Sequence, residues 1–121
     1  MKYYLREIAH ARSGDKGDTN NIGLIAYRPE YYPIIDEQVT ADRVREHFKG
    51  LVKGRVTRYD LPQLHAVNFV LEQALGGGVT RSLSMDMHGK SYSALILTMA
   101  VSVPDDLSRQ LAELGRKPLQ A

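Results

Sequence analysis

The sequence predicts an α+β sandwich, with a mainly antiparallel sheet and helices on one face. Short runs rich in strand-forming residues alternate with two stretches that have apolar residues at helical spacing, and glycines and prolines separate them. The chain has 121 residues, of which 43% are hydrophobic and 25% charged. That length and composition are typical of one globular domain. We therefore expect a single domain over residues 1–121.

Two N-terminal runs predict a β-hairpin. Lys2–His10 is rich in strand formers, and Asn21–Tyr27 is a second short apolar run. The polar stretch between them is then the connecting loop. Beyond the hairpin, Pro29 and Pro33 divide an aromatic segment, Arg28–Gln38, which is expected to form a turn or a short helix.

A first helix is expected over Ala41–Lys49. Thr40 is suited to the N-cap, because its hydroxyl can accept from a backbone N–H in the first turn. Val44 and Phe48 lie four residues apart and so share one face of the helix. Gly50 would end it.

A strand over Lys53–Tyr59 and a second, longer helix follow. Asp60 can cap that helix, and Pro62 suits its first turn. One apolar stripe at helical spacing comprises Leu64, Val67, Leu71, Ala74 and Leu75. Gly76 would end the helix.

The C-terminal third predicts a second hairpin and a tail. Val79–Asp86 and Ser91–Val103 have strand character, with His88-Gly89-Lys90 where the turn belongs. Residues 103–121 form a peripheral tail that contains an amphipathic helix, Asp106–Leu114. The element order ββαβαββ buries both main helices against one face of the sheet, close to a ferredoxin-like sandwich.

Composition argues against several classes of function. The net charge of +2 is low for a nucleic-acid-binding domain. The basic stretch Arg43–Arg58 fits either a solvated surface or a site for an acidic partner. The chain has no cysteine, which removes disulfides and thiol nucleophiles and fits a cytoplasmic protein. No apolar run reaches the roughly 18 residues of a membrane span.

The polar segment His10–Asn21 is the strongest candidate for a working surface. It combines glycines, carboxylates, cations and amides, without the spacing of a phosphate-binding P-loop. A turn that satisfies its own hydrogen bonds through Asp15 and Asp18 is one interpretation. Ligand binding is the other, because a turn does not need the added cations. The expected ligand-binding residues are Arg12, Ser13, Gly14, Lys16, Gly17, Asn20 and Asn21.

A second glycine segment follows the longer predicted helix. A helix C-cap needs only one glycine, and this segment has three in succession. They indicate either that another group approaches the backbone closely here or that the segment is flexible. Its candidate ligand-binding residues are Gly76, Gly77, Gly78, Thr80 and Arg81. If the fold brings the two glycine segments together, their donors could hold a phosphate or a carboxylate.

The histidines give no metal site, because none of the four makes a two-histidine helical spacing. We expect neither a metal nor a cofactor. His10, at the mouth of the polar segment, is the candidate general base, since imidazole titrates near neutral pH. Asp15 and Asp18 are the candidate acids or bases. His65 is expected to be structural, and the adjacent tyrosine pairs fit either sheet packing or a homo-oligomer contact.

Several motifs together resemble a known family. They are HARSGDKGDTNN at residues 10–21, FKGLVKG at 48–54, residues 64–75 with the following GGGVTRSL, and HGK at 88–90. They resemble the AtuA-like ferredoxin-fold domain, found at the C-terminus of acyclic terpene utilisation proteins and as a free-standing chain. The similarity runs to about Val103. It implies a ferredoxin-like fold and a role in acyl-CoA metabolism, in breakdown of acyclic terpenoids or related branched acids, and it brings no assigned catalytic residue.

Two hypotheses of function follow from the residues and the resemblance. In the first, the chain is an accessory subunit that works with a larger AtuA-type partner and binds an acyl-CoA or an organic acid through its glycine segments. In the alternative, it is a small enzyme, a hydro-lyase or hydrolase acting on a branched acyl-CoA thioester. His10, Asp15 or Asp18 would then act as acid or base, and Lys16 or Arg81 would stabilise an oxyanion.

Overall fold

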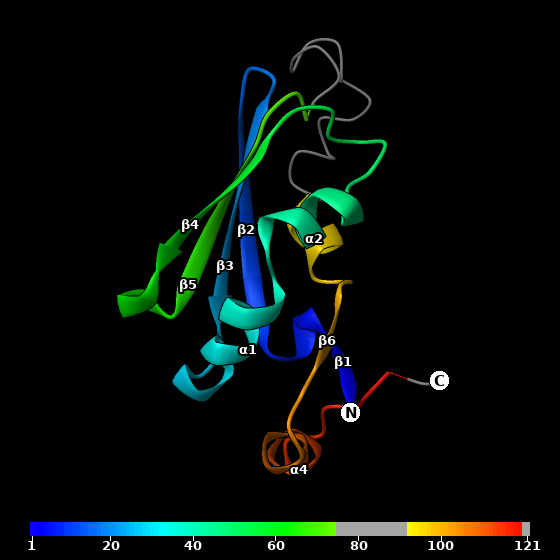
Figure 1. Ribbon diagram of the computed structural model, residues 1–121. Coiled ribbons are helices and arrows are strands. Elements are labelled where there is room, and N and C mark those ends of the chain that lie inside the picture. Colours follow the sequence, from blue (N-terminus) through cyan, green and yellow to red (C-terminus); the bar gives the residue numbers. More distant parts are fainter. Residues whose placement is uncertain (75–91, 120–121) are drawn as a thin grey trace.

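The computed structural model describes residues 1–74 and 92–119 and contains two antiparallel sheets (Figure 1). The four-stranded sheet has the order β2-β3-β5-β4, formed by β2 (Ala9–Lys16), β3 (Thr19–Ala26), β5 (Ala66–Leu71) and β4 (Val56–Leu61). The two-stranded sheet pairs β1 (Lys2–Tyr4) with β6 (Ala100–Ser102). Antiparallel sheets combined with helices confirm the predicted α+β class.

The helices are short. They are α1 (Tyr32–Gln38), α2 (Ala41–His47) and α4 (Asp105–Glu113), with a helical segment at 92–96 and 3-10 turns at η1 (Leu5–Glu7), η2 (Pro29–Tyr31) and η3 (Pro62–Leu64). The Thr40 hydroxyl accepts from the backbone N–H of Arg43 at 3.1 Å, which confirms the predicted cap of α2. The bounds of α4 confirm the predicted C-terminal helix to within one residue at each end. Among the described residues, no helix is long and apolar enough to cross a membrane.

The core lies between the four-stranded sheet and the helices. Alternate residues of the two central strands are fully buried, because successive side chains of a strand point to opposite faces. Those residues are Ile22, Leu24, Val67, Phe69 and Leu71, and they share one cluster with Ile35, Val44 and Phe48 of the helical layer.

The opposite face of this sheet is called here the outer face. Register assigns to it His10, Arg12, Gly14 and Lys16 of β2, Thr19, Asn21, Gly23 and Ile25 of β3, Ala66, Asn68 and Val70 of β5, and Thr57, Tyr59 and Leu61 of β4. In Figure 1, α1 and α2 lie on the other side of the sheet. The described strands place two cations and no carboxylate on the outer face.

The long helix predicted after Asp60 is wrong, because the chain there forms the end of β4, the turn η3 and the strand β5. Pro62 starts a single 3-10 turn, and His65 then adopts a left-handed conformation (φ 53°), which no α-helix continues through. The following run is rich in β-branched and aromatic residues and alternates between buried and half-buried positions. The segment therefore forms a strand, because alternate residues are buried, although its apolar residues also fit the spacing of a helix.

Two predicted strands are also wrong in part. Lys2–His10 is divided, because η1 separates β1 from β2 and the Leu5 N–H donates to the Met99 carbonyl at 2.7 Å. In the predicted strand Ser91–Val103, residues 92–96 are helical and only Ala100–Ser102 forms a strand. The predicted strand Val79–Asp86 and the turn His88-Gly89-Lys90 lie outside the described residues.

Candidate functional site

The polar segment forms the end of the β2–β3 hairpin and is not the long loop predicted from its composition. Gly14 pairs with Asn21, Asp15 with Asn20 and Lys16 with Thr19. Only two residues remain for the turn, and the first, Gly17, has a positive φ of 64° that glycine adopts without strain. The pairing sends neighbouring side chains to opposite faces of the sheet.

The expected ligand-binding residues are consequently divided between two faces. Arg12, Gly14 and Lys16 belong to the outer face with Asn21, whose side chain is exposed. Ser13 pairs with Ile22 and lies on the core face. Asn20 is also on the core face and is fully buried, so it is placed to stabilise the hairpin and not to contact a ligand at the surface.

A depression of about 350 Å³ lies at the hairpin end of the outer face. Its lining comprises Gly14, Asp15, Lys16, Thr19, Asn21 and Val70. Lys16, Thr19 and Asn21 carry an ammonium, a hydroxyl and an amide, all hydrogen-bond donors, at the border of one space whose exposed surface is mostly apolar. A Cβ at Gly14 would lie 3.4 Å from the Asn21 Oδ1. Because Gly14 has no side chain, nothing projects from the backbone into the depression at this position.

The cations at this end of the sheet are not neutralised by the described residues. Arg12 and Lys16 are exposed, and neither makes an ion pair or a side-chain hydrogen bond within residues 1–74 and 92–119. Asp15 is the one carboxylate in the lining of the depression. Asp15 can offset only one of the two positive charges of Arg12 and Lys16, so the arrangement suits an anionic ligand.

The structure does not bring the three candidate acid–base residues together. His10 stacks on Tyr27, with ring centroids 5.3 Å apart. It is five residues from Asp15 along β2, about 17 Å at the usual rise of a strand. Asp18 lies in the hairpin turn. No group of three or more potential metal ligands occurs in the described part of the chain.

The second glycine segment, Gly76–Gly78 with Thr80 and Arg81, lies outside the described residues. The residues before and after that part of the chain are placed beside the hairpin turn. The Ala74 N–H donates to the Asp18 carbonyl at 2.9 Å, and the Tyr92 hydroxyl donates to the Ala74 carbonyl. Burial raises the pKa of Tyr92, and the negative charge of Asp18 raises it further. Ala74, Tyr92 and Asp18 thus form one contact at the end of the hairpin.

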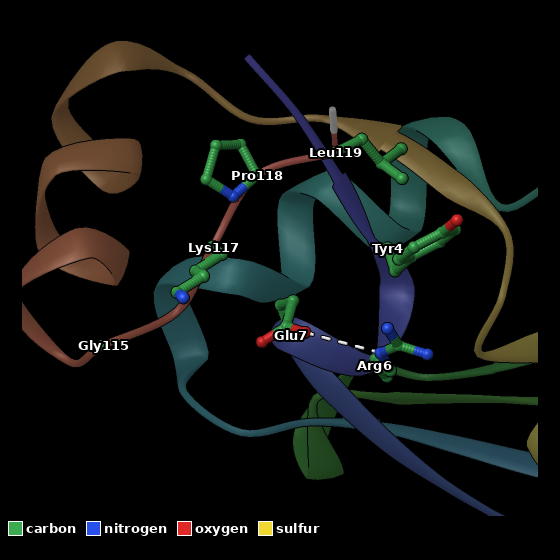
Figure 2. A pocket seen from close by; sticks show the side chains of 7 residues that line it. All are labelled: Tyr4, Arg6, Glu7, Gly115, Lys117, Pro118 and Leu119. Carbon is green, nitrogen blue, oxygen red and sulfur yellow. Dashed lines mark ion pairs between the residues drawn. The ribbon is translucent and has the colours of Figure 1, made fainter. Parts of the chain in front are cut away.

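Sequence reasoning missed Thr19 and Val70, although strand alternation through the hairpin would have placed Thr19 opposite Lys16. It also missed the cavities beside the C-terminal tail, which join residues more than a hundred positions apart. One of about 530 Å³ is lined by Tyr4, Arg6, Glu7, Gly115, Lys117, Pro118 and Leu119 (Figure 2). The Arg6 guanidinium lies 4.6 Å from the centroid of the Tyr4 ring and 3.5 Å from the Glu7 carboxylate. No local pattern in the sequence indicates such a cavity.

Comparison with known families gives one result. The AtuA ferredoxin-like domain family matches residues 3–102. A comparison with curated proteins gave no match, and a comparison with solved structures gave none either. The match extends from β1 to β6 and leaves α4 outside, and it confirms both the predicted resemblance and the ferredoxin-like fold class. The chain therefore belongs to the AtuA ferredoxin-like domain family.

Proposed function

We propose that this chain is a binding domain that holds the anionic group of an organic acid or an acyl-CoA in the depression at the end of the β2–β3 hairpin. The observation that carries the proposal is the convergence of Lys16, Thr19 and Asn21 on one concave space. Arg12 adds a second cation on the same face, four residues from Lys16 along β2.

The charges and the shape of the depression both favour an anion. A carboxylate or phosphate accepts hydrogen bonds from ammonium, hydroxyl and amide groups, and bonds to a charged group are about twice as strong as neutral ones. Gly14 leaves backbone accessible where a side chain would otherwise stand. Val70 gives an apolar surface for the part of the ligand next to its charged end.

The depression is open, and this supports a role as an accessory subunit. Ligand sites usually bury most of the surface of a small molecule, which a shallow sheet surface does not do alone. A partner subunit would then cover the open side of the depression. The family match suggests that this partner is a larger AtuA-type protein working in acyl-CoA, acyclic terpenoid or branched-acid breakdown. The participation of Arg81 and of the glycines before it stays a prediction, and the proposal rests on the described residues.

The catalytic alternative has no specific support from the described geometry. A hydro-lyase or hydrolase needs its acid, base and oxyanion donors within reach of one reacting group. His10 and Asp15 are separated along β2, so these two residues do not form such a centre.

Calorimetric titration with coenzyme A tests the binding proposal, because this probe carries phosphates and needs no assumption about the acyl group. We expect Lys16→Gln to weaken binding about tenfold, the loss that one hydrogen bond to a charged group gives. Lys53→Gln is the matched control, since Lys53 is exposed and does not line the depression. Equal affinity of the wild type and the Lys16→Gln variant, or no binding by the wild type, contradicts the proposal.

A further inference from the structure

A second cavity lies between α4 and the connection that follows β3. It measures about 290 Å³ and is lined by Glu7, Tyr27, Arg28, Tyr31, Leu111, Leu114 and Arg116. The last three residues follow position 102 and so lie outside the part of the chain that the family matches. This cavity is therefore made jointly by the family domain and by the additional C-terminal helix.

The floor of the cavity is apolar and firmly held. Tyr31 and Leu111 are each only 1% exposed, whereas Tyr27 and Leu114 at the edge are about half exposed, at 50% and 51%. The Tyr31 hydroxyl donates to the Gln110 Oε1 at 2.9 Å, which fixes α4 against η2. Without rearrangement, an apolar group of a ligand would contact mainly the half-exposed Tyr27 ring and Leu114, above a base formed by Tyr31 and Leu111.

The rim of the cavity is basic. Arg116 reaches the Glu7 Oε1 at 3.4 Å, and its Cζ lies 5.6 Å from the centroid of the Tyr27 ring. Glu7 also pairs with Arg6 at 3.5 Å, on the side shown in Figure 2. The Glu7 carboxylate thus forms ion pairs with two guanidiniums, those of Arg6 and Arg116. Among the residues that line the cavity, Arg28 and Arg116 outnumber the one carboxylate, that of Glu7, and Arg28 makes no ion pair with any described residue. The negative charge of Glu30, which does not line the cavity, also acts on the Tyr31 hydroxyl.

The larger cavity in Figure 2 is less suited to a ligand of this kind. It lies at Gly115 and Lys117 of the same tail, and its aromatic ring, Tyr4, is covered by the Arg6 guanidinium. That cation and that ring already satisfy each other. In the smaller cavity Arg116 also lies near a ring, that of Tyr27, but at the longer distance of 5.6 Å, and Arg28 makes no ion pair with a described residue.

We propose that the cavity beside α4 is a second binding site, for a small amphipathic carboxylate. The carboxylate lies between Arg28 and Arg116, and the apolar chain packs on Tyr27 and Leu114. Guanidiniums bind carboxylates through paired N–H donors, and a volume of about 290 Å³, at the lower limit of ligand pockets, admits only a small acid. Binding requires both the charge and the apolar chain.

Nuclear magnetic resonance titration of the full chain tests this assignment, with octanoate as the probe. Octanoate should shift the amide signals of Tyr27, Leu111 and Leu114. Octanol, which lacks the charge, and acetate, which lacks the chain, should each bind at least about tenfold more weakly. Arg28→Gln should weaken octanoate binding about tenfold, the effect of losing one charged hydrogen bond. Arg109→Gln, on the exposed side of α4, should leave it unchanged.

The results that would overturn this second site can be told apart from those that would overturn the site at the β2–β3 hairpin. Acetate binding as tightly as octanoate, or equal octanoate affinity in the Arg28→Gln variant, overturns the proposed site. Octanoate shifts confined to Thr19 and Asn21 also overturn it, and would instead report the depression at the β2–β3 hairpin. Lys16→Gln should leave the shifts at Tyr27 and Leu114 intact, so failure at one site does not imply failure at the other.

Discussion

The side-chain amide of Gln38 bonds to both backbone groups of Ser102, as a neighbouring strand would. Its Nε2 donates to the Ser102 carbonyl at 2.7 Å, and the Ser102 N–H donates to its Oε1, also at 2.7 Å. Arg43 extends the contact by donating to the Ala100 carbonyl at 2.9 Å. Side chains from the helical layer therefore occupy the edge of β6 that β1 leaves open, and such an edge otherwise invites pairing with another chain.

Gln38→Glu should destabilise the fold by about 1 kcal/mol at neutral pH, because the carboxylate keeps the acceptor for the Ser102 N–H but loses the donor to its carbonyl. Urea unfolding measures the difference. Gln110→Glu is the matched control, since Gln110 uses only its oxygen, as acceptor from the Tyr31 hydroxyl. Equal destabilisation by both substitutions would show that the paired geometry at Ser102 has no special weight.

Arg58 joins β4 to the end of α1. Its guanidinium donates to the Asp36 carboxylate at 2.5 Å, the Asp60 carboxylate at 2.7 Å and the Asp36 carbonyl at 2.9 Å. Burial lowers the pKa of Arg58, but the hydrogen bonds with Asp60 and Asp36 outweigh it, and the net pKa is raised.

Arg58→Lys should cost about 1 to 3 kcal/mol of unfolding free energy, because an ammonium keeps the charge but cannot make this fork of hydrogen bonds. Chemical denaturation checks the value. Arg55→Lys, at an exposed position nearby, should change it by no more than about 0.5 kcal/mol. A loss of stability in the Arg55 variant as large as in the Arg58 variant would refute the geometric argument.

Gly54→Ala should destabilise the protein by about 1 to 3 kcal/mol, a typical cost of overpacking. A Cβ at Gly54 would lie 2.6 Å from the Glu72 carbonyl oxygen, and this atom belongs to the backbone of the neighbouring segment. Gly23→Ala provides the comparison, because its nearest atom is 4.0 Å away. Thermal unfolding midpoints should fall clearly for the first variant and little for the second, and the reverse order would contradict the close approach.

Stability should decline in alkali partly through Tyr92. Its folded-state pKa is raised above 10.0 by burial and by Asp18, so its contribution is complete below pH 10 and is lost as pH rises through the folded-state pKa. Tyr92→Phe should cost about 1 kcal/mol at pH 8, through the lost bond to Ala74. The difference from the wild type should shrink above pH 10 in urea unfolding. A constant difference from pH 8 to pH 11 would argue against the raised pKa.

Local chemistry predicted some elements well. The Thr40 cap, the aromatic segment before it and the amphipathic α4 follow from residues within one or two turns of each other, so a sequence pattern carries their signal. The helix predicted after Asp60 failed because Val67 and Leu71, four residues apart, fit both the helical and the strand period, and only pairing with β3 and β4 selects the strand.

The hairpin end shows the same limit at the candidate site. Composition identified its polar residues but predicted a loop, because glycines and aspartates are typical of turns. Pairing with a partner strand, with Asn20 buried opposite Leu71, keeps the segment extended. The strand register, which composition does not give, then decides that Lys16 and Asn21 share the outer face and that Ser13 does not.

The pairing of β1 with β6 sets an order on folding. Lys2 lies opposite Ser102, and the Tyr3 hydroxyl meets the Ser108 Oγ at 3.0 Å across 105 positions of the chain. Contacts so distant in sequence require nearly the whole polypeptide before they form, and their loop-closure entropy must be met first. The β2–β3 hairpin, closed by two residues, has no such requirement, whereas β1 has no partner strand until β6 has been synthesised.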